Sequence, residues 1–305
     1  MRRAIISTLV DLAGADSRIV LLTGDLGFMA VEPFAQRFPD RFFNVGVAEE
    51  NMVGIATGLA EAGLIPFVYS IATFASLRPY EFIRNGPIRR HLPVRILGIG
   101  GGFEYGPAGA THHALEDVAV MRAQPGLAVM APADAAQAAS VLRATWNLTG
   151  PVYYRLGKKE SPSIPGLDGA FEIGRLQTVR DGSDVAFVTL GPLAAEAIEA
   201  AHLLEPSGIS CAVLALASVS PAPVEDLRSW LARVRVVVTV EAHYCPGGIG
   251  SLVAEVIAEA GLPCRLVRCG VWNQAGPLTG SEAWLNGQHG LTAEHLAGVV
   301  RAQPA

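Results

Sequence analysis

Charge, cysteine and long apolar runs are all scarce in this sequence. Only 17% of its 305 residues are Asp, Glu, Lys or Arg, and the formal net charge is −5. No group of Lys and Arg is interleaved with aromatic residues, so the chain lacks the basic surface that nucleic-acid binding needs. Asp11 and Asp16 interrupt the apolar N-terminal run, and no run reaches about 18 apolar residues. We therefore expect a cytoplasmic globular protein without a signal peptide. We also expect that it binds neither nucleic acid nor membrane.

The four cysteines offer neither a metal site nor a disulfide framework. They are Cys211, Cys245, Cys264 and Cys269. None forms a C-x-x-C pair, and no histidines accompany them at the spacing of a zinc site. We expect four reduced thiols in the core and no metal ligand among them.

The length and composition suit two domains with ordinary cores, since 50% of the residues are hydrophobic. Short apolar runs alternate with helical patterns, which predicts parallel sheets covered by helices. Residues 158–172 are rich in Pro and Gly and indicate a linker. The predicted fold is two parallel-sheet α/β domains, residues 1–157 and 173–305. In the second, we expect strands at 184–190, 211–214 and 234–240 and helices at 193–204, 223–232 and 249–260.

The segment at residues 42–60 organises the first domain. A β-like apolar run meets Gly46 and continues as a helix from about Ala48. On that helix Glu50 shares a face with polar residues and points toward water, whereas Glu49 points inward. The face of Glu49 continues through Met52, Val53, Ala56, Leu59 and Ala60. A carboxylate on an apolar face needs a proton or a donor, so we expect Glu49 to have a partner.

Two structural explanations for this helix stand beside a functional one. Glu49 could accept hydrogen bonds from the first backbone amides of its own helix. Gly54, Gly58 and Ala62 form a small-residue stripe, which indicates close approach of another helix or subunit.

Residues 46–49, Gly-Val-Ala-Glu, with the following helix resemble the pyrimidine-binding domain of thiamine-diphosphate enzymes of the transketolase group. The resemblance implies that Glu49 bonds to N1′ of the cofactor's aminopyrimidine across a subunit interface. In that role it promotes the tautomer that deprotonates the thiazolium C2. This would explain an inward carboxylate.

A second cluster of candidate residues follows at Phe74, Leu77 and Tyr80. Their three-residue spacing would place them on adjoining parts of one helical face, and ordinary core packing is one explanation. The resemblance implies another, in which Phe74 and Tyr80 wall the aminopyrimidine and Phe74 stacks on it. Leu77 departs from the family pattern, which has an aromatic residue there.

A glycine-rich loop after an expected strand at 94–100 leads to two histidines. Thr111 is the expected N-cap of a helix through Met121, which would place His112 and His113 where ligands bind in open α/β sheets. Capping or surface roles explain adjacent histidines as well. The run Gly-Ala-Thr-His-His-x-x-Glu-Asp resembles the transketolase segment that contacts substrate over the thiazolium. It implies that His112 donates to, or exchanges a proton with, a substrate oxygen.

Two further positions bear on the substrate. Ala108 stands where transketolases and deoxyxylulose-phosphate synthases usually have an aspartate that binds a substrate hydroxyl. Its replacement removes a hydrogen bond worth roughly 1.5–3 kcal/mol, so a standard pentose phosphate is not the expected substrate. Arg155 resembles a family arginine that reaches the phosphate or distal end of the substrate. A strand-end arginine facing solvent is the alternative.

The C-terminal half extends the resemblance. Glu241, His243 and the pair Gly247-Gly248 resemble the transketolase C-terminal domain. We interpret the glycine pair as serving close turns and interface packing rather than as a phosphate loop.

The N-terminal domain with which transketolases bind diphosphate and metal has no counterpart in this sequence. Residues 24–27, Gly-Asp-Leu-Gly, do not complete the family's Gly-Asp-Gly metal motif. The resemblance therefore implies a split enzyme, inert as this chain alone, whose N-terminal partner subunit holds Mg²⁺ (or Ca²⁺) with thiamine diphosphate. An α2β2 heterotetramer is the simplest arrangement.

The expected function is transfer of a ketol or acyl unit from a keto donor to an aldehyde acceptor, by the smaller subunit of a transketolase-type carbon–carbon transferase. Two alternatives stay open. The β subunit of a 2-oxoacid dehydrogenase shares this layout, although the Thr-His-His segment argues against it. A non-catalytic regulatory or scaffolding subunit is the other, and Ala108 gives it some support.

Overall fold

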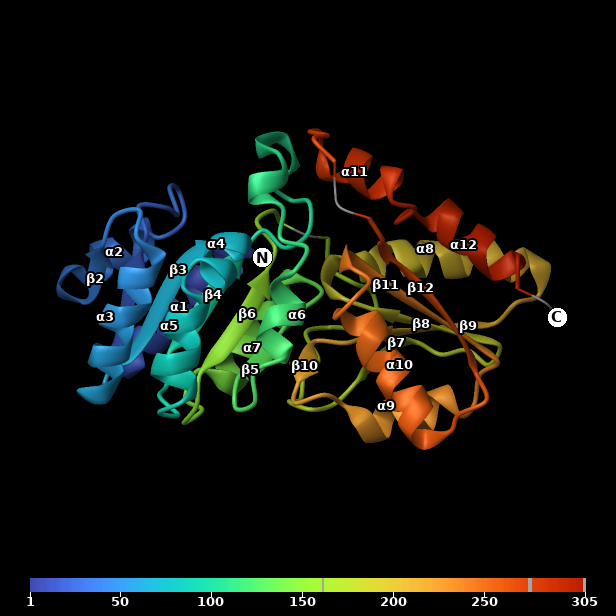
Figure 1. The fold of residues 1–305 in the computed structure, drawn as a ribbon, viewed down its shortest axis with the longest axis horizontal. Helices are drawn as coiled ribbons and strands as arrows, with labels where there is room; N and C mark the ends of the chain where they lie inside the picture. Colours follow the sequence, from blue (N-terminus) through green and yellow to red (C-terminus); the bar gives the residue numbers. More distant parts are fainter. Residues whose placement is uncertain (161, 274–275, 304–305) are drawn as a thin grey trace.

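Residues 1–160, 162–273 and 276–303 are described by the computed structural model, which has two sheets side by side, each between layers of helices (Figure 1). In this part of the chain the first sheet has seven strands in the order β10-β5-β6-β4-β3-β1-β2. They are β1 (Ile19–Thr23), β2 (Phe42–Asn44), β3 (Ile65–Ile71), β4 (Arg95–Ile99), β5 (Ala128–Met130), β6 (Val152–Leu156) and β10 (Ser218–Ser220). The central strands β1, β3, β4 and β6 are buried along their whole length, as parallel strands covered on both faces should be.

Helices pack on both faces of this sheet. One face carries α1 (Arg2–Ala15), α2 (Glu32–Arg37) and α7 (Ala135–Thr145). The other carries α3 (Glu49–Glu61), α4 (Ala72–Leu77), α5 (Tyr80–Ile83) and α6 (Asp117–Arg122). A π-helical turn follows α5 at Arg84–Ile88, and short 3₁₀ turns lie at Pro39–Arg41, Gly106–Ala108, Ala110–His112, Gly191–Leu193 and Glu205–Ser207.

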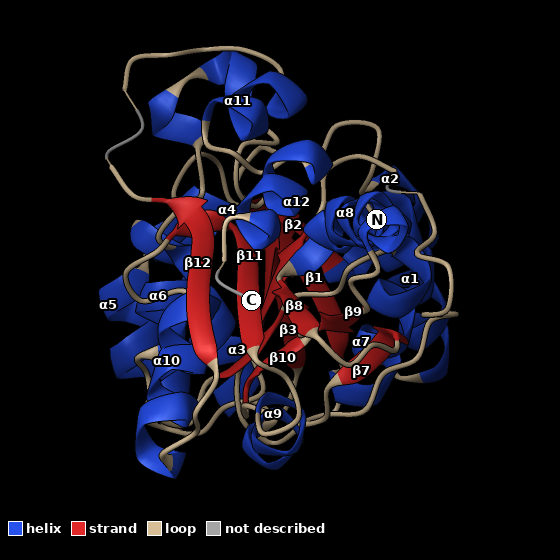
Figure 2. Ribbon diagram, turned by 90° about the vertical axis from the view of Figure 1, so that its right-hand side faces the viewer, coloured by secondary structure: helices blue, strands red, loops and turns tan. Residues whose placement is uncertain are grey.

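The second sheet has, in the described part of the chain, five strands in the order β12-β11-β8-β9-β7. They are β7 (Gln177–Arg180), β8 (Val185–Thr189), β9 (Cys211–Ala215), β11 (Val236–Tyr244) and β12 (Arg265–Val271). Figure 2 shows α8 (Ala194–Leu204) and α12 (Ala293–Arg301) on one side of it and α9 (Val224–Leu231) and α10 (Ile249–Ala260) on the other. The remaining helix, α11 (Glu282–Gln288), stands away from the sheet at the top of that view.

The two sheets share one hydrophobic core. A single cluster of buried residues runs from α3 and α6 of the first domain to β8, α9 and α10 of the second. Strand β10, which lies in the second half of the chain, pairs antiparallel with β5 of the first sheet. The domains are therefore joined by packing and by a strand, in addition to the connecting segment.

The predicted fold class is confirmed, with antiparallel pairing only at the β10 and β7 edges among the described strands. Helix α10 spans the predicted residues, and the other predicted elements of the second domain lie within a few residues of the observed ones. Strands β7, β10 and β12 were not predicted. All four cysteines are buried and free, as expected. None of the described helices combines the length and apolar character needed to cross a bilayer.

One predicted element is wrong. Thr111 does not cap a helix through Met121, because residues 110–112 form a 3₁₀ turn and α6 begins only at Asp117 after the N-cap residue Glu116. The intervening chain is extended instead: Gly102 and Ala114 exchange two backbone hydrogen bonds, of 2.9 and 3.0 Å. A helix and this bridge cannot form from the same backbone groups.

Candidate functional site

Glu49 is buried at the start of α3, with 1% of its surface exposed. The predicted inward orientation is confirmed, and Glu50 is only partly buried. The Ser70 hydroxyl donates to Oε1 of Glu49 at 2.8 Å, and Nη1 of Arg78 donates to Oε2 at 2.8 Å. These partners are side chains from β3 and from the end of α4, so the carboxylate is not simply capping its own helix.

Arg78 connects Glu49 to Phe74. Its guanidinium carbon lies 3.8 Å from the centre of the Phe74 ring, within the range of a cation–π contact. The half-buried Phe74 ring also contacts the His112 ring in an edge-on arrangement, with 5.0 Å between the ring centroids. Glu49, Ser70, Phe74, Arg78 and His112 thus form one continuous set of contacts, which we call the Glu49 cluster.

Leu77 and Tyr80 do not lie on one helical face with Phe74, contrary to the prediction. Helix α4 ends at Leu77, and Tyr80 begins a new helix, α5, so one continuous helical face does not carry all three. Leu77 is 40% exposed. The Tyr80 hydroxyl donates to the carbonyl of Val120 on α6 at 3.0 Å, which ties α5 to α6.

His112 sits at the outer end of the loop that follows β4. Its Nδ1 lies 2.9 Å from the Thr111 hydroxyl, and its ring is only partly buried. The neighbouring His113 points the other way: it is buried, and neither of its ring nitrogens has a hydrogen-bond partner among the described residues. Of the two histidines, His112 is the one that belongs to the Glu49 cluster.

Arg155 lies on β6 and is buried rather than facing solvent. Its Nε donates to Asp117 at 2.9 Å, and its Nη2 donates to the carbonyls of Ala114 and Ala242. Asp117 also accepts a 2.7 Å hydrogen bond from Tyr153, whose pKa burial raises well above 10. These contacts favour a positioning role for Arg155 over the direct substrate contact that the resemblance implies.

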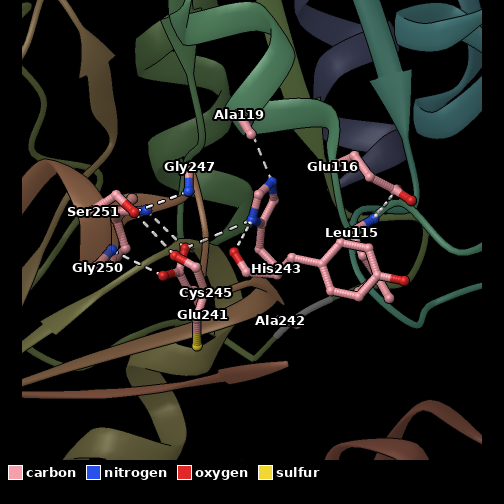
Figure 3. Close-up of polar contacts among 12 residues, drawn as sticks. Leu115, Glu116, Ala119, Glu241, Ala242, His243, Cys245, Gly247, Gly250 and Ser251 are labelled. Carbon is pink, nitrogen blue, oxygen red and sulfur yellow. Dashed lines mark hydrogen bonds and ion pairs between the residues drawn. The ribbon is translucent and has the colours of Figure 1, made fainter. Parts of the chain in front are cut away.

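A buried polar network, which we call the domain seam, joins α6 and β6 to β11. It consists of Asp117, Ala119, Arg155, Ala242 and His243. Nε2 of His243 accepts from the backbone N–H of Ala119 at 3.3 Å, and its Nδ1 donates to the carbonyl of Tyr244 at 2.6 Å (Figure 3). Burial lowers the pKa of His243 to about 4, so the imidazole is neutral and both of its nitrogens are satisfied.

Beside the seam, Glu241 closes the N-terminus of α10. Its carboxylate accepts from the backbone N–H groups of Ile249 and Gly250 at 2.7 and 2.9 Å (Figure 3). A Cβ at Gly248 would collide with that carboxylate, and a Cβ at Gly247 would lie 2.6 Å from the Ala119 side chain. The glycine pair therefore serves close packing, as interpreted from the sequence. The Glu241 carboxylate occupies the helix N-terminus where a bound phosphate would otherwise lie.

A cavity of about 320 Å³ lies between the two domains, with Glu104, Arg155 and Glu282 in its wall. Burial and the charge of Glu282 raise the pKa of Glu104 to about 7. None of the cavity's lining residues belongs to the Glu49 cluster, so the two features are separate.

The described residues contain no group of three or more His, Cys, Asp or Glu side chains that could hold a metal ion. The pyrimidine half of a thiamine cofactor is a different matter. The buried carboxyl group of Glu49 lies beside the aromatic face of Phe74, and the planar guanidinium of Arg78 contacts both. A planar heterocycle could occupy the same place, with one proton between its acceptor nitrogen and the carboxyl group. The residues present therefore fit the pyrimidine, while no described cluster fits its metal.

Residues 1–163 match the family described as "Transketolase, pyrimidine binding domain", and residues 174–296 match "Transketolase, C-terminal domain". The chain belongs to the transketolase family. Of its residues, 97% align at 38% identity with 94% of a putative transketolase C-terminal section from Methanocaldococcus jannaschii. A relative from Actinobacillus succinogenes, described as one of the subunits of an apulose-4-phosphate transketolase, is 35% identical over 87% of this chain and 86% of its own.

A solved structure described as a split gene transketolase, an inactive β4 tetramer, matches this transketolase subunit with a TM-score of 0.89. The two chains are 39% identical, and the match covers 98% of this chain and 96% of the other. This chain therefore has the same two-domain layout, over almost the same length, as that chain of a split transketolase.

The sequence predicted the members of the Glu49 cluster except Ser70 and Arg78. It singled out Arg155 and His243 but did not predict the domain seam that connects them. Ser70 ends an apolar strand and Arg78 follows Leu77, and neither carries a local pattern that indicates a carboxylate partner. Asp117 and His243 lie in segments that resemble the family, but the hydrogen bond that joins these segments, from Ala119 to His243, spans 124 residues.

Proposed function

We propose that this chain is the smaller subunit of a cytoplasmic, thiamine-diphosphate-dependent transketolase that transfers a ketol or acyl unit from a keto donor to an aldehyde acceptor. The observation that carries the proposal is the Glu49 cluster. It combines a fully buried carboxylate, an aromatic face and a partly exposed imidazole, and these three groups suit cofactor activation, ring stacking and proton exchange with a substrate.

Each residue of the cluster has a role toward the pyrimidine. Glu49 would hold or share a proton at N1′, with Ser70 orienting its carboxylate through the 2.8 Å hydrogen bond. Phe74 would support the ring by stacking, and Tyr80 would fix α5 against α6 next to it. When bound, thiamine diphosphate supplies the carbanion chemistry that breaks and makes carbon–carbon bonds. Arg78 must swing aside, and its 39% exposure leaves it room to do so.

On the substrate side, His112 would donate to, or take a proton from, the oxygen that changes charge. Ala108 lies exposed on the 3₁₀ turn that precedes His112 and brings no carboxylate to the substrate. We therefore propose a donor or acceptor other than a standard pentose phosphate, one that lacks the hydroxyl an aspartate would bind. Arg155 would act indirectly, through the backbone at Ala114.

The partner that we propose is the subunit that binds diphosphate and Mg²⁺ (or Ca²⁺), in an α2β2 heterotetramer. Large apolar side chains are exposed in the loops that follow the paired strands β1 and β2, including Phe28, Met29 and Val47 at 84%, 83% and 72%. On α3, added Cβ atoms at Gly54 and Gly58 would meet nothing within 4 Å. An open apolar face of this kind is typical of a subunit interface. The description of a solved relative as an inactive β4 tetramer supports the need for a partner.

The test is reconstitution with an N-terminal transketolase subunit and comparison of Glu49→Gln with Glu50→Gln. We expect Glu49→Gln to abolish ketol transfer, because an amide cannot exchange a proton with N1′, and Glu50→Gln to keep most of the activity. Equal losses in the two variants would refute the role of Glu49. Turnover that requires lipoamide would indicate a 2-oxoacid dehydrogenase subunit instead. If Glu49→Gln leaves the ketol-transfer activity of the complex unchanged, this chain is a non-catalytic subunit.

A further inference from the structure

The loop at residues 100–116, which we call the His112 loop, rises from the carboxyl end of β4 and reaches α11 of the second domain (Figure 1). It is closed at its base by the two hydrogen bonds between Gly102 and Ala114. His112 lies near its outer end, against Phe74. The position of His112 over the Glu49 cluster is therefore set by whatever holds this loop.

The second domain touches the loop backbone directly. A Cβ at Gly102 would lie 2.7 Å from the Cβ of Ala242, and a Cβ at Gly106 would lie 2.5 Å from the carbonyl oxygen of Gly280. The same atom at Gly106 would lie 2.6 Å from the Leu285 side chain. Side chains at these positions would push the loop away from the second domain, so glycine permits an approach that no other residue allows.

An aromatic clasp, made of Phe103, His113 and His289, lies at the centre of this contact. Phe103 is fully buried, and the His289 ring is stacked on it at 5.1 Å with an interplanar angle of 5°. His113 meets the same ring edge-on, at 5.1 Å and 82°. Burial lowers the pKa values of both histidines, so each acts as a neutral flat ring. Leu115, Val271 and Leu285 complete this small core with residues from both domains.

The domain seam fixes the far end of the loop. The backbone N–H of Tyr244 donates to the carbonyl of Leu115 at 2.8 Å. Nη2 of Arg155 donates to the carbonyls of Ala114 and Ala242. Just beyond the loop, Nε2 of His243 accepts from the backbone N–H of Ala119 (Figure 3). The loop is thus held by the second domain at its base, at its centre and at its exit.

We propose that the second domain positions the active site, with Phe103, His289 and Leu285 as positioning residues that set where His112 stands relative to Phe74. The proposal rests on the proposed function, because it needs His112 to contact substrate. A displacement of about 1 Å in a catalytic group can cost on the order of a hundredfold in rate. A loop with this many glycines would sample such displacements unless it were clasped.

The experiment compares His289→Ala with His289→Phe in the full chain, with Gly298→Ala as the matched control because an added Cβ there meets nothing within 4 Å. Hydrogen–deuterium exchange of the chain by itself is the first measurement. We expect His289→Ala to raise exchange at residues 103–116 at least threefold, and His289→Phe to restore slow exchange since a phenyl ring can stack on Phe103. Exchange in α3 and β3 should stay unchanged.

Kinetics of the reconstituted complex are the second measurement. We expect His289→Ala to lower kcat by about 10- to 100-fold without changing the affinity for thiamine diphosphate, and His289→Phe to recover most of kcat. If His289→Ala does not fold, Leu285→Ala should show the same pattern with a smaller effect. Unchanged exchange in the loop, or a kcat loss that His289→Phe fails to recover, would overturn the proposal. If the wild-type complex shows no ketol transfer, the proposed function fails, and the exchange measurement still decides whether the second domain holds the loop.

Discussion

Two arginine–carboxylate pairs in the first domain share the same chemistry but have opposite surroundings. Arg155 and Asp117, in the domain seam, are 5% and 0% exposed, and two backbone carbonyls hold a further nitrogen of the guanidinium. Arg78 and Glu49 have a similarly short ion-pair distance, but Arg78 is 39% exposed and its remaining contact is an aromatic face. One pair is almost completely buried, with only the guanidinium of Arg155 bordering the cavity between the domains, and the other is exposed to solvent on the side of its cation.

The difference separates a structural pair from an exchangeable one. Removing the cation of the buried pair would leave the Asp117 carboxylate buried, with Tyr153 as its one remaining side-chain donor among the described residues. Removing the cation of the open pair leaves Glu49 with Ser70 and a face that another planar group can cover. The same buried carboxylate can therefore be satisfied in the single chain and remain available to a ligand.

The largest expected effect comes from breaking the buried pair. Asp117→Ala should lower the free energy of unfolding by about 3–5 kcal/mol, because it leaves the Arg155 guanidinium and the Tyr153 hydroxyl buried without their acceptor. Urea unfolding followed by circular dichroism measures this. A loss below about 1 kcal/mol would show that the pair is not closed to water.

The open pair should respond differently. Arg78→Met should cost only about 1–2 kcal/mol, because water can replace the lost donor from the open side while Ser70 keeps its hydrogen bond to Glu49. In the reconstituted complex, the Kd for thiamine diphosphate, measured by titration calorimetry, should fall, because the guanidinium no longer has to be displaced. A weaker affinity would mean that Arg78 supports the cofactor rather than yielding to it.

A pH series sharpens the comparison at His243. Its pKa of about 4 in the folded chain lies below the ordinary 6.5, so between these values the unfolded chain binds a proton that the folded chain does not. This contribution lowers stability as the pH falls from 6.5 toward 4, by on the order of 1–2 kcal/mol at pH 5. Oε2 of Glu241 lies 4.0 Å from Nδ1 of His243, and burial raises the pKa of Glu241 to about 7. Between pH 4.5 and 7, the contribution of Glu241 to stability therefore increases as the pH falls, opposite to that of His243.

The comparison of wild type with His243→Gln isolates the histidine. The variant should be less stable at pH 7, and its deficit should shrink at pH 5, since only the wild type suffers from protonation of the unfolded state. Urea unfolding at the two pH values measures the deficit. A deficit that stays constant would show that His243 keeps an ordinary pKa in the seam.

The smallest effect is expected at the rim of the seam. Arg122 pairs with Glu255, which is 49% exposed, at 2.5 Å. Glu255→Gln should change the free energy of unfolding by about 0.5 kcal/mol or less, because water screens an exposed ion pair. A loss comparable to that of Asp117→Ala, in the same urea assay, would remove the distinction between open and buried pairs.

These contrasts also show what the sequence could predict. The burial of Glu49 followed from helical periodicity, because every residue that decides it lies within four turns of chain. The seam did not, because His243 and Ala119 are 124 residues apart and leave no local pattern. The expected helix at Thr111 failed for a related reason. Contacts with Ala242 and Gly280 favour an extended glycine loop that local capping preferences do not indicate.

Strand β10 lies in the second half of the chain yet completes the edge of the first sheet, where the backbone N–H of Ala131 also bonds to the carbonyl of Ala217 at 2.8 Å. A fragment that stopped at the linker would leave β5 with unpaired amides and carbonyls, ready to recruit a strand from a neighbouring molecule. Producing the pyrimidine-binding half as an independent module, for fusion or domain exchange, would therefore require grafting residues 217–220 or capping that edge.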